Sequence, residues 1–143
     1  MQILTAPTDQ EMNLLTTVPT NVVQSIRAFR VADLHAEAAR LGHHFLYATC
    51  AGATTKQQVL GIIAQSFHVP KYVGKNFDAL SSCLTDFVYK SGAQTGFLIV
   101  LEQLPNTSKF DKEARETLLD VFRDAADFWS DKKIAFRVFY SFE

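Results

Sequence analysis

The chain has 143 residues, of which 48% are hydrophobic and 20% charged, and its formal net charge is −1. This length and composition are ordinary for one globular domain with its own core. No apolar run approaches the roughly 18 residues of a membrane-spanning helix. No basic stretch precedes an apolar one at the N-terminus, so we expect a cytoplasmic protein without a secretory signal. The absence of a basic stripe with interleaved aromatics disfavours nucleic-acid binding.

The first third of the chain is weakly patterned. Residues 1–19 are polar and are interrupted by two prolines, which predicts a loosely ordered arm. Asn21–Val31 fits either a helix face or a strand. The next stretch, Asp33–Leu41, predicts a helix that is capped by its first residue and ended by Gly42 in the left-handed conformation. We therefore expect residues 20–42 to form an added helical layer.

Strand and helix patterns alternate through the rest of the chain. The strand patterns are Phe45–Cys50, Gly96–Leu101 and Ile134–Phe142. Helix patterns cover about 55–68, about 76–90 and Phe110–Trp129. Strands separated by helices need crossover connections, which give a parallel sheet. The expected organisation is one domain over residues 20–143, with its core in residues 43–143.

One stretch, Pro70–Phe87, combines a loop with an amphipathic helix. Gly74 permits a tight turn, and Asn76 suits the N-cap because its side-chain oxygen can accept a bond from an amide one turn later. Apolar residues then recur at a spacing of three and four, which predicts one buried stripe. They are Phe77, Leu80, Cys83, Leu84 and Phe87.

The opposite side of this helix is polar. Asp78, Ser82 and Asp86 are spaced by four, so they share one outward face. This face follows a loop that carries Tyr72. The pattern favours a surface that contacts another molecule.

The same stretch carries a family resemblance. From Pro70 the chain reads Pro-x-Tyr-x-Gly-x-Asn-x-Asp-Ala-Leu-x-x-Cys-Leu-Thr. This pattern resembles the signature of barstar-like proteins, the intracellular inhibitors of barnase-type ribonucleases. A weaker match is Val121–Asp124, and the resemblance covers about Phe45–Phe142. It implies an α/β fold with a three-stranded parallel sheet, in the order 1-2-3, and packed helices, here with an N-terminal helical extension.

The resemblance also implies a function. A ribonuclease active site is lined with cations that hold phosphate, and an inhibitor can occlude it by presenting carboxylates and an aromatic ring where the RNA would lie. The implied partner is a cytotoxic, basic ribonuclease, and we expect the free inhibitor to be a monomer. The resemblance and the helix spacing together predict the partner-binding residues Tyr72, Gly74, Asn76, Asp78, Ser82, Thr85, Asp86 and Asp124.

Three positions depart from the resemblance. Barstar itself has acids at the positions of Lys75 and Ser82, and a tryptophan at that of Ser81. Asp86, one turn beyond Ser82, could supply the missing carboxylate. The departures keep an alternative open, in which the same fold binds a toxin that is not a ribonuclease, or another protein.

Enzyme signatures are missing from the sequence. None of the four histidines lies in a Ser-His-Asp or HExxH context, and there is no phosphate-binding glycine motif. Cys50 and Cys83 lack CxxC spacing, so we expect free thiols and no zinc site. We therefore expect a protein that is not an enzyme and that uses no metal or cofactor.

Overall fold

The computed structural model describes residues 14–86 and 95–143, which form a parallel sheet with helices on both faces. The strands are β1 (Asn21–Ser25), β2 (His44–Thr49), β3 (Gly96–Leu104) and β4 (Ala135–Phe142), in the order β1-β4-β3-β2. The helices are α2 (Val31–Leu41), α3 (Lys56–Ser66), the short 3-10 helix η1 (Lys71–Gly74), α4 (Phe77–Leu84) and α6 (Lys112–Asp131). The predicted α/β class and parallel sheet are confirmed.

The number of strands is a correction. The three expected strands lie in the expected order, as β2-β3-β4, but the sheet has a fourth strand. Asn21–Ser25 forms β1, parallel to β4, so residues 20–42 are a strand and a helix and not a helical layer alone. The β-branched Val22 and Val23 suit a pleated strand, and β1 covers what would otherwise be the open edge of β4.

Asn21 fixes the start of this added strand. Its side-chain amide donates hydrogen bonds to the carbonyls of Ala126, at 3.0 Å, and Ile134, at 2.9 Å. One side chain thereby joins β1 to the last turns of α6 and to the residue before β4. Both acceptors are more than a hundred residues away in sequence, so the contact depends on the finished fold.

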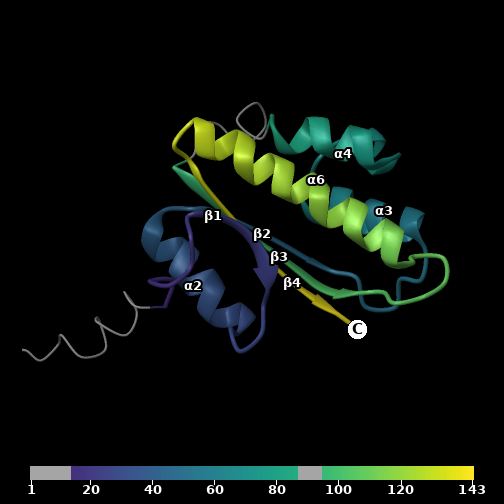
Figure 1. Ribbon diagram of the computed structural model, residues 1–143, viewed down its shortest axis with the longest axis horizontal. Coiled ribbons are helices and arrows are strands. Elements are labelled where there is room, and N and C mark those ends of the chain that lie inside the picture. The colour runs from purple at the N-terminus through teal and green to yellow at the C-terminus, as the bar shows by residue number, and fades with distance from the viewer. Residues whose placement is uncertain (1–13, 87–94) are drawn as a thin grey trace, which may run out of the picture.

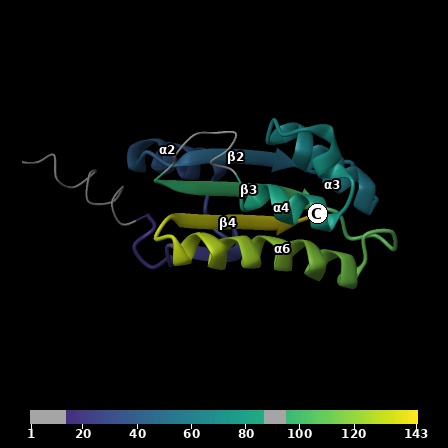
Figure 2. The same ribbon diagram turned by 90° about the horizontal axis from the view of Figure 1, so that it is seen from above.

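The helices divide unequally between the two faces of the sheet. Figure 1 shows α2 on one face and α3 and α6 on the other. Seen from above, α3 lies toward the β2 edge of this face and α6 lies along β4, with α4 between them (Figure 2). The surface outside α4 and α6 is therefore supported by two layers, the helices and the sheet beneath them.

Each face has its own apolar core. The larger core joins the inward sides of α3, α4 and α6 to residues such as Phe97, Ile99 and Val138. The smaller core, under α2, includes Leu98, Val100, Phe139, Leu34, Ala38, Leu15 and Val18. Strands covered on both faces read as continuous apolar runs, and β3 fits this rule because its first six residues are all buried.

The helix ends show which local expectations hold. Gly42 follows α2 with φ of 73°, as predicted. The helix itself begins at Val31 after Arg30, so Asp33 lies in its first turn and does not cap it. Asn76 caps α4 as expected, but α4 ends at Leu84 and not near residue 90. Residues 87–94, and with them the end of the expected apolar stripe, lie outside the described residues.

The arm expected over residues 1–19 is only partly described. Residues 1–13 lie outside the described residues. Leu15 and Val18 are buried, with 6% and 7% of their surfaces exposed, and they pack against the smaller core. Pro19 also accepts a hydrogen bond from the Arg137 side chain at 3.2 Å. The last residues before β1 are therefore a packed part of the structure.

Candidate protein-binding surface

The loop before α4 is a single tight turn that sorts its side chains. Pro70, with φ of −57°, precedes η1, and the amide of Val73 bonds the Pro70 carbonyl at 3.0 Å. Val73 is buried with 1% of its surface exposed, whereas the neighbouring Tyr72 is 68% exposed. A large aromatic side chain left this exposed on a well-anchored turn is suited to contact a partner.

Two residues of the predicted set, Gly74 and Asn76, have roles in the fold. A Cβ atom at Gly74 would lie 3.1 Å from the carbonyl oxygen of Leu60 and 3.3 Å from Gly61 Cα, so a side chain here would push η1 and α3 apart by a few tenths of an ångström. The Asn76 side chain accepts a hydrogen bond from the Ala79 amide at 2.8 Å and thereby caps α4. Gly74 and Asn76 therefore set the geometry of the loop and of the helix start.

The outer side of α4 carries exposed polar side chains. Leu80 and Leu84 are buried, and Asp78 and Ser82 are exposed one turn apart. Among the described residues, the carboxylates of Asp78 and Asp86 belong to no ion pair. Asp86 lies past the helix end, and its amide bonds the Cys83 carbonyl at 2.9 Å. The three residues expected on one helix face are thus two helical residues and one in the turn that follows.

Thr85 has its hydroxyl occupied locally. It donates to the carbonyls of Ser82, at 3.1 Å, and Ser81, at 3.5 Å. Thr85 follows the last helical residue, so the hydroxyl satisfies carbonyls that the helix leaves open at its end. These local bonds explain a threonine at position 85, so no contact with a protein partner is needed to explain it.

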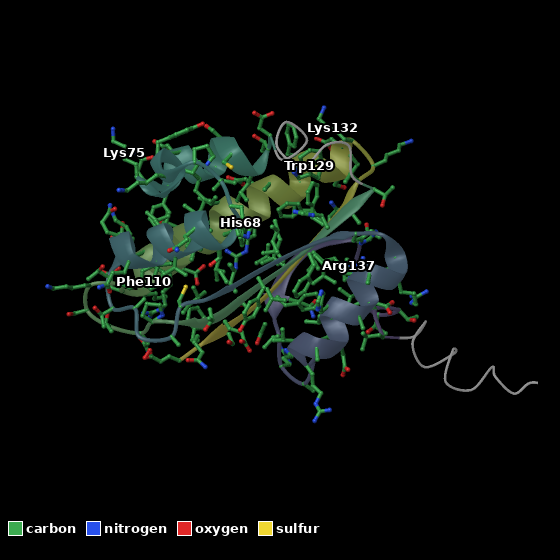
Figure 3. All side chains as sticks on the ribbon, turned by 180° about the vertical axis from the view of Figure 1, so that it is seen from behind. His68, Lys75, Phe110, Trp129, Lys132 and Arg137 are labelled. Carbon is green, nitrogen blue, oxygen red and sulfur yellow. The ribbon has the colours of Figure 1, made fainter. Side chains whose placement is uncertain are left out.

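The indole of Trp129 attaches α4 to α6. Trp129 is 2% exposed, and its Nε1 donates a hydrogen bond to the Leu84 carbonyl at 2.8 Å. Figure 3 shows Trp129 pointing inward and the side chains of Lys75 and Lys132 pointing outward at opposite ends of the helical side. This bond holds the last turn of α4 on the helix that carries Asp124.

Asp124 is exposed on α6, the helix that packs against α4. One turn earlier, Val121 packs in the same cluster as Leu80 and Leu84. Its neighbour Arg123 is engaged elsewhere, with Asp120 at 2.7 Å and Glu116 at 3.4 Å. Asp124 belongs to none of the ion pairs of the described residues. The fold therefore presents Asp124 as an uncompensated carboxylate on a helix adjoining α4.

A concave site next to this surface was missed in the sequence-based prediction. A pocket of about 640 Å³ lies between α3 and η1, and Lys71 and Lys75 stand at it. The sequence does signal it: Lys75 departs from the acid of the resemblance, and Gly61 is an unexplained glycine in a helix. A glycine in a helix interior costs about 1 kcal/mol relative to alanine, yet a Cβ atom built on Gly61 meets no heavy atom within 4 Å.

Burial and hydrogen bonding shift the pKa values of titratable groups outside this surface. Burial raises the pKa of the Cys50 thiol to about 11, which keeps it protonated and unreactive. Tyr47 donates a hydrogen bond to Glu102, and this bond raises the pKa of the Tyr47 hydroxyl. Neither Cys50 nor Cys83 forms a disulfide bond, as expected. Within residues 14–86 and 95–143, no cluster of three metal-ligating side chains occurs.

The match to known proteins agrees with this architecture. The family model described as Barstar (barnase inhibitor) matches residues 43–141, which run from just before β2 almost to the end of β4 and include η1 and α4. The chain therefore belongs to the barstar family, whose members are protein inhibitors and not enzymes. No curated protein matches the chain. No helix in the described part is both long and apolar enough to cross a membrane.

Proposed function

We propose that this protein is an immunity inhibitor that binds a cytotoxic ribonuclease in the cytoplasm of the producing cell and occludes its active site. The single observation that carries the proposal is Tyr72, 68% exposed on η1, directly before the helix that carries the exposed Asp78, a carboxylate outside the ion pairs of the described residues. Family membership supports a ribonuclease as partner. The free protein acts as a monomer, without a metal or a cofactor.

In this proposal the surface imitates RNA. Tyr72 takes the place of a base, and Asp78, Asp86 and Asp124 take the place of phosphates by accepting charge-assisted hydrogen bonds from arginine or lysine side chains. Because η1 is packed on α3 and α4 on α6, the backbone of this surface loses little conformational freedom when a partner binds. Ser82 contributes a neutral contact.

The first experiment identifies the partner. The tagged protein is used to capture binding proteins from its source cell, and these are identified by mass spectrometry and assayed for ribonuclease activity. A small basic ribonuclease that the protein inhibits at a stoichiometry of one to one supports the proposal. A partner without nuclease activity contradicts it and favours the same fold acting on another toxin or protein.

The second experiment tests the surface with that partner. Asp78→Ala and Asp124→Ala should each raise the dissociation rate roughly tenfold or more, because each leaves a cation of the partner buried and unpaired. Asp127→Ala, a matched exposed acid on α6, and Ser82→Ala should stay within about twofold. Melting curves of all four variants should coincide with the wild type. If the Asp78 and Asp124 variants dissociate like the controls, the binding surface lies elsewhere.

One specific observation favours a second candidate. Lys75 is a cation where the resemblance has an acid, and with Lys71 it makes the η1 side of the surface basic. A site that is acidic on α4 and basic on η1 suits a partner of mixed charge, which need not be a ribonuclease. The capture experiment decides between the two.

A further inference from the structure

The pocket between α3 and η1 is built from both elements. Its lining combines small or apolar residues with polar and cationic ones. The lining consists of Gln57, Gly61, Ala64, Gln65, Val69, Lys71, Gly74 and Lys75. Its volume of about 640 Å³ is ample for an inserted side chain.

Gly61 in this lining has no explanation in the fold. It lies in the middle of α3 and is exposed, and a Cβ atom built on it meets no heavy atom within 4 Å. Gly74 differs, because a Cβ there would press on the backbone of α3 at 3.1 Å. An alanine at position 61 would fit and would favour the helix. The glycine leaves open space on the surface of α3 that lines the pocket.

Two of the residues that line the pocket are cations. Neither Lys71 nor Lys75 belongs to an ion pair of the described residues. The side-chain amide of Gln57 donates to the main-chain carbonyl of Lys75 at 3.2 Å, which joins α3 to the residue after η1. Lys71 begins η1 and Lys75 follows its last residue, and both line the pocket. An anion bound there would gain charge-assisted contacts with both ammonium groups.

We infer that this pocket receives a carboxylate-bearing side chain of the protein partner, with its methylene stem on Gly61, Ala64 and Val69 and its carboxylate between Lys71 and Lys75. The inference rests on the proposed function and refines it. Lys75 is followed directly by Asn76, the cap of α4, so a partner that covers Asp78 also covers the pocket mouth. Such an inhibitor presents acids on α4 to cations of the partner, and it presents cations at η1 to an acid of the partner. Such crossed charges restrict binding to a partner that carries both.

The pocket can be tested without the partner. The probe is N-acetyl-glutamate methylamide, titrated into the ¹⁵N-labelled full-length protein, and the control is the uncharged N-acetyl-glutamine methylamide. A fragment of this size should bind with a dissociation constant on the order of 1 mM. Saturable shifts are expected at the amides of Gly61, Ala64 and Val69 with the glutamate probe. Equal shifts with the glutamine probe overturn the inference.

Variants separate the pocket from general charge attraction. The double variant Lys71→Gln/Lys75→Gln should lower the affinity for the probe at least fivefold, and Lys132→Gln, a lysine at the opposite end of the helical side, should leave it unchanged. Gly61→Leu should abolish binding by filling the pocket. Gly61→Ala should raise the melting temperature by about 3 °C, because its Cβ meets nothing. If the Gly61→Leu variant unfolds, the double lysine variant still decides.

Two further outcomes bear on the inference. Inorganic phosphate that binds the same amides more tightly than the glutamate probe would overturn it in favour of a phosphate site. When the partner is in hand, Lys75→Gln should speed its dissociation at least fivefold, and Lys132→Gln should not. The proposed function fails if Asp78→Ala and Asp124→Ala bind like the wild type, and the inference fails if the lysine variants do, so the two failures are distinguishable.

Discussion

The two faces of the sheet are built in different ways. The face under α3 and α6 is packed with apolar side chains and one buried indole whose N–H has an acceptor. The face under α2 holds a small apolar core beside two buried charged residues, Glu37 at 4% and Arg137 at 7% exposed. The family match begins at residue 43, so the first face belongs to the family part and the second is closed by residues that precede it.

The polar side of this second face is incompletely paired. Glu37 accepts hydrogen bonds from Arg40, one of them at 2.9 Å, and Arg137 donates through Nε to the Pro19 carbonyl. Arg137 Nη1 and His43 Nδ1 are buried without a hydrogen-bond partner among the described residues. Figure 3 places Arg137 between the sheet and α2. Buried polar groups that are only partly satisfied weaken a core, so we expect this face to set the limit of stability.

The largest expected effect comes from truncation. Deletion of residues 1–19 removes Leu15, Val18 and the carbonyl that Arg137 bonds, and two buried aliphatic side chains contribute about 3 kcal/mol or more. Deletion of residues 1–13 should leave the unfolding free energy within about 0.5 kcal/mol. Denaturant unfolding of the two truncated proteins measures the difference. Equal stabilities would mean that the second face does not depend on Leu15 and Val18. We accordingly propose that the removable arm ends before Leu14.

An intermediate effect is expected on the first face. Trp129→Phe keeps most of the buried ring and removes the donor, which leaves the Leu84 carbonyl unpaired at a cost of about 1–3 kcal/mol. Amide exchange in α4 should speed up more than in α3, since the lost bond is the one that attaches the end of α4. Phe128→Leu, at the half-buried neighbouring position, is the control. Uniform acceleration across both helices would show that α4 is held by packing alone.

How far the sequence predicts this structure depends on the range of the contacts involved. The cap at Asn76, the glycine at position 42 and the strand pattern near residue 100 rest on local chemistry, and these predictions are confirmed. The strand at 21–25 was missed because Val22 and Val23 fit both patterns, and its partner β4 lies more than a hundred residues away. The end of α4 was missed because the apolar spacing continues past Leu84.

The candidate surface shows the same limit. Tyr72 and Asp78 lie within one local motif, so the sequence predicts their exposure on adjoining elements. The packing of α6, which carries Asp124, against α4 includes the Trp129 bond, and the pocket at Gly61 depends on η1 packing against α3. Neither arrangement has a periodicity to read. Strand alternation predicts that Arg137 lies on the other face of β4 from Phe136 and Val138. Its burial, however, requires α2 and the residues before β1.

The smallest expected effect is a pH dependence that arises on the second face. Burial, and then the positive charge of Arg137, lower the pKa of His43, while Glu37 on α2 acts in the opposite direction. A histidine with a lowered pKa binds fewer protons in the folded state than in the unfolded state. Stability is therefore complete above the ordinary pKa of about 6.5 and falls as the pH drops below it.

This dependence can be isolated with one variant. Between about pH 7.5 and 5.5 the wild type should lose stability, by less than about 1.4 kcal/mol from one histidine, and solvent screening of this half-buried ring makes the loss smaller. His43→Gln cannot titrate in this range and should show a flatter profile. Burial lowers the pKa of His44 as well, so some slope should remain in the variant. Urea unfolding at several pH values measures both profiles.

Because a Cβ at Gly96 would lie 2.6 Å from the His43 ring, the ring has little room to swing out toward solvent on that side when it is protonated. Parallel profiles for the two proteins would mean that the protonated His43 ring reaches solvent in another direction. The buried charged groups under α2 would then not limit the stability of the protein as proposed.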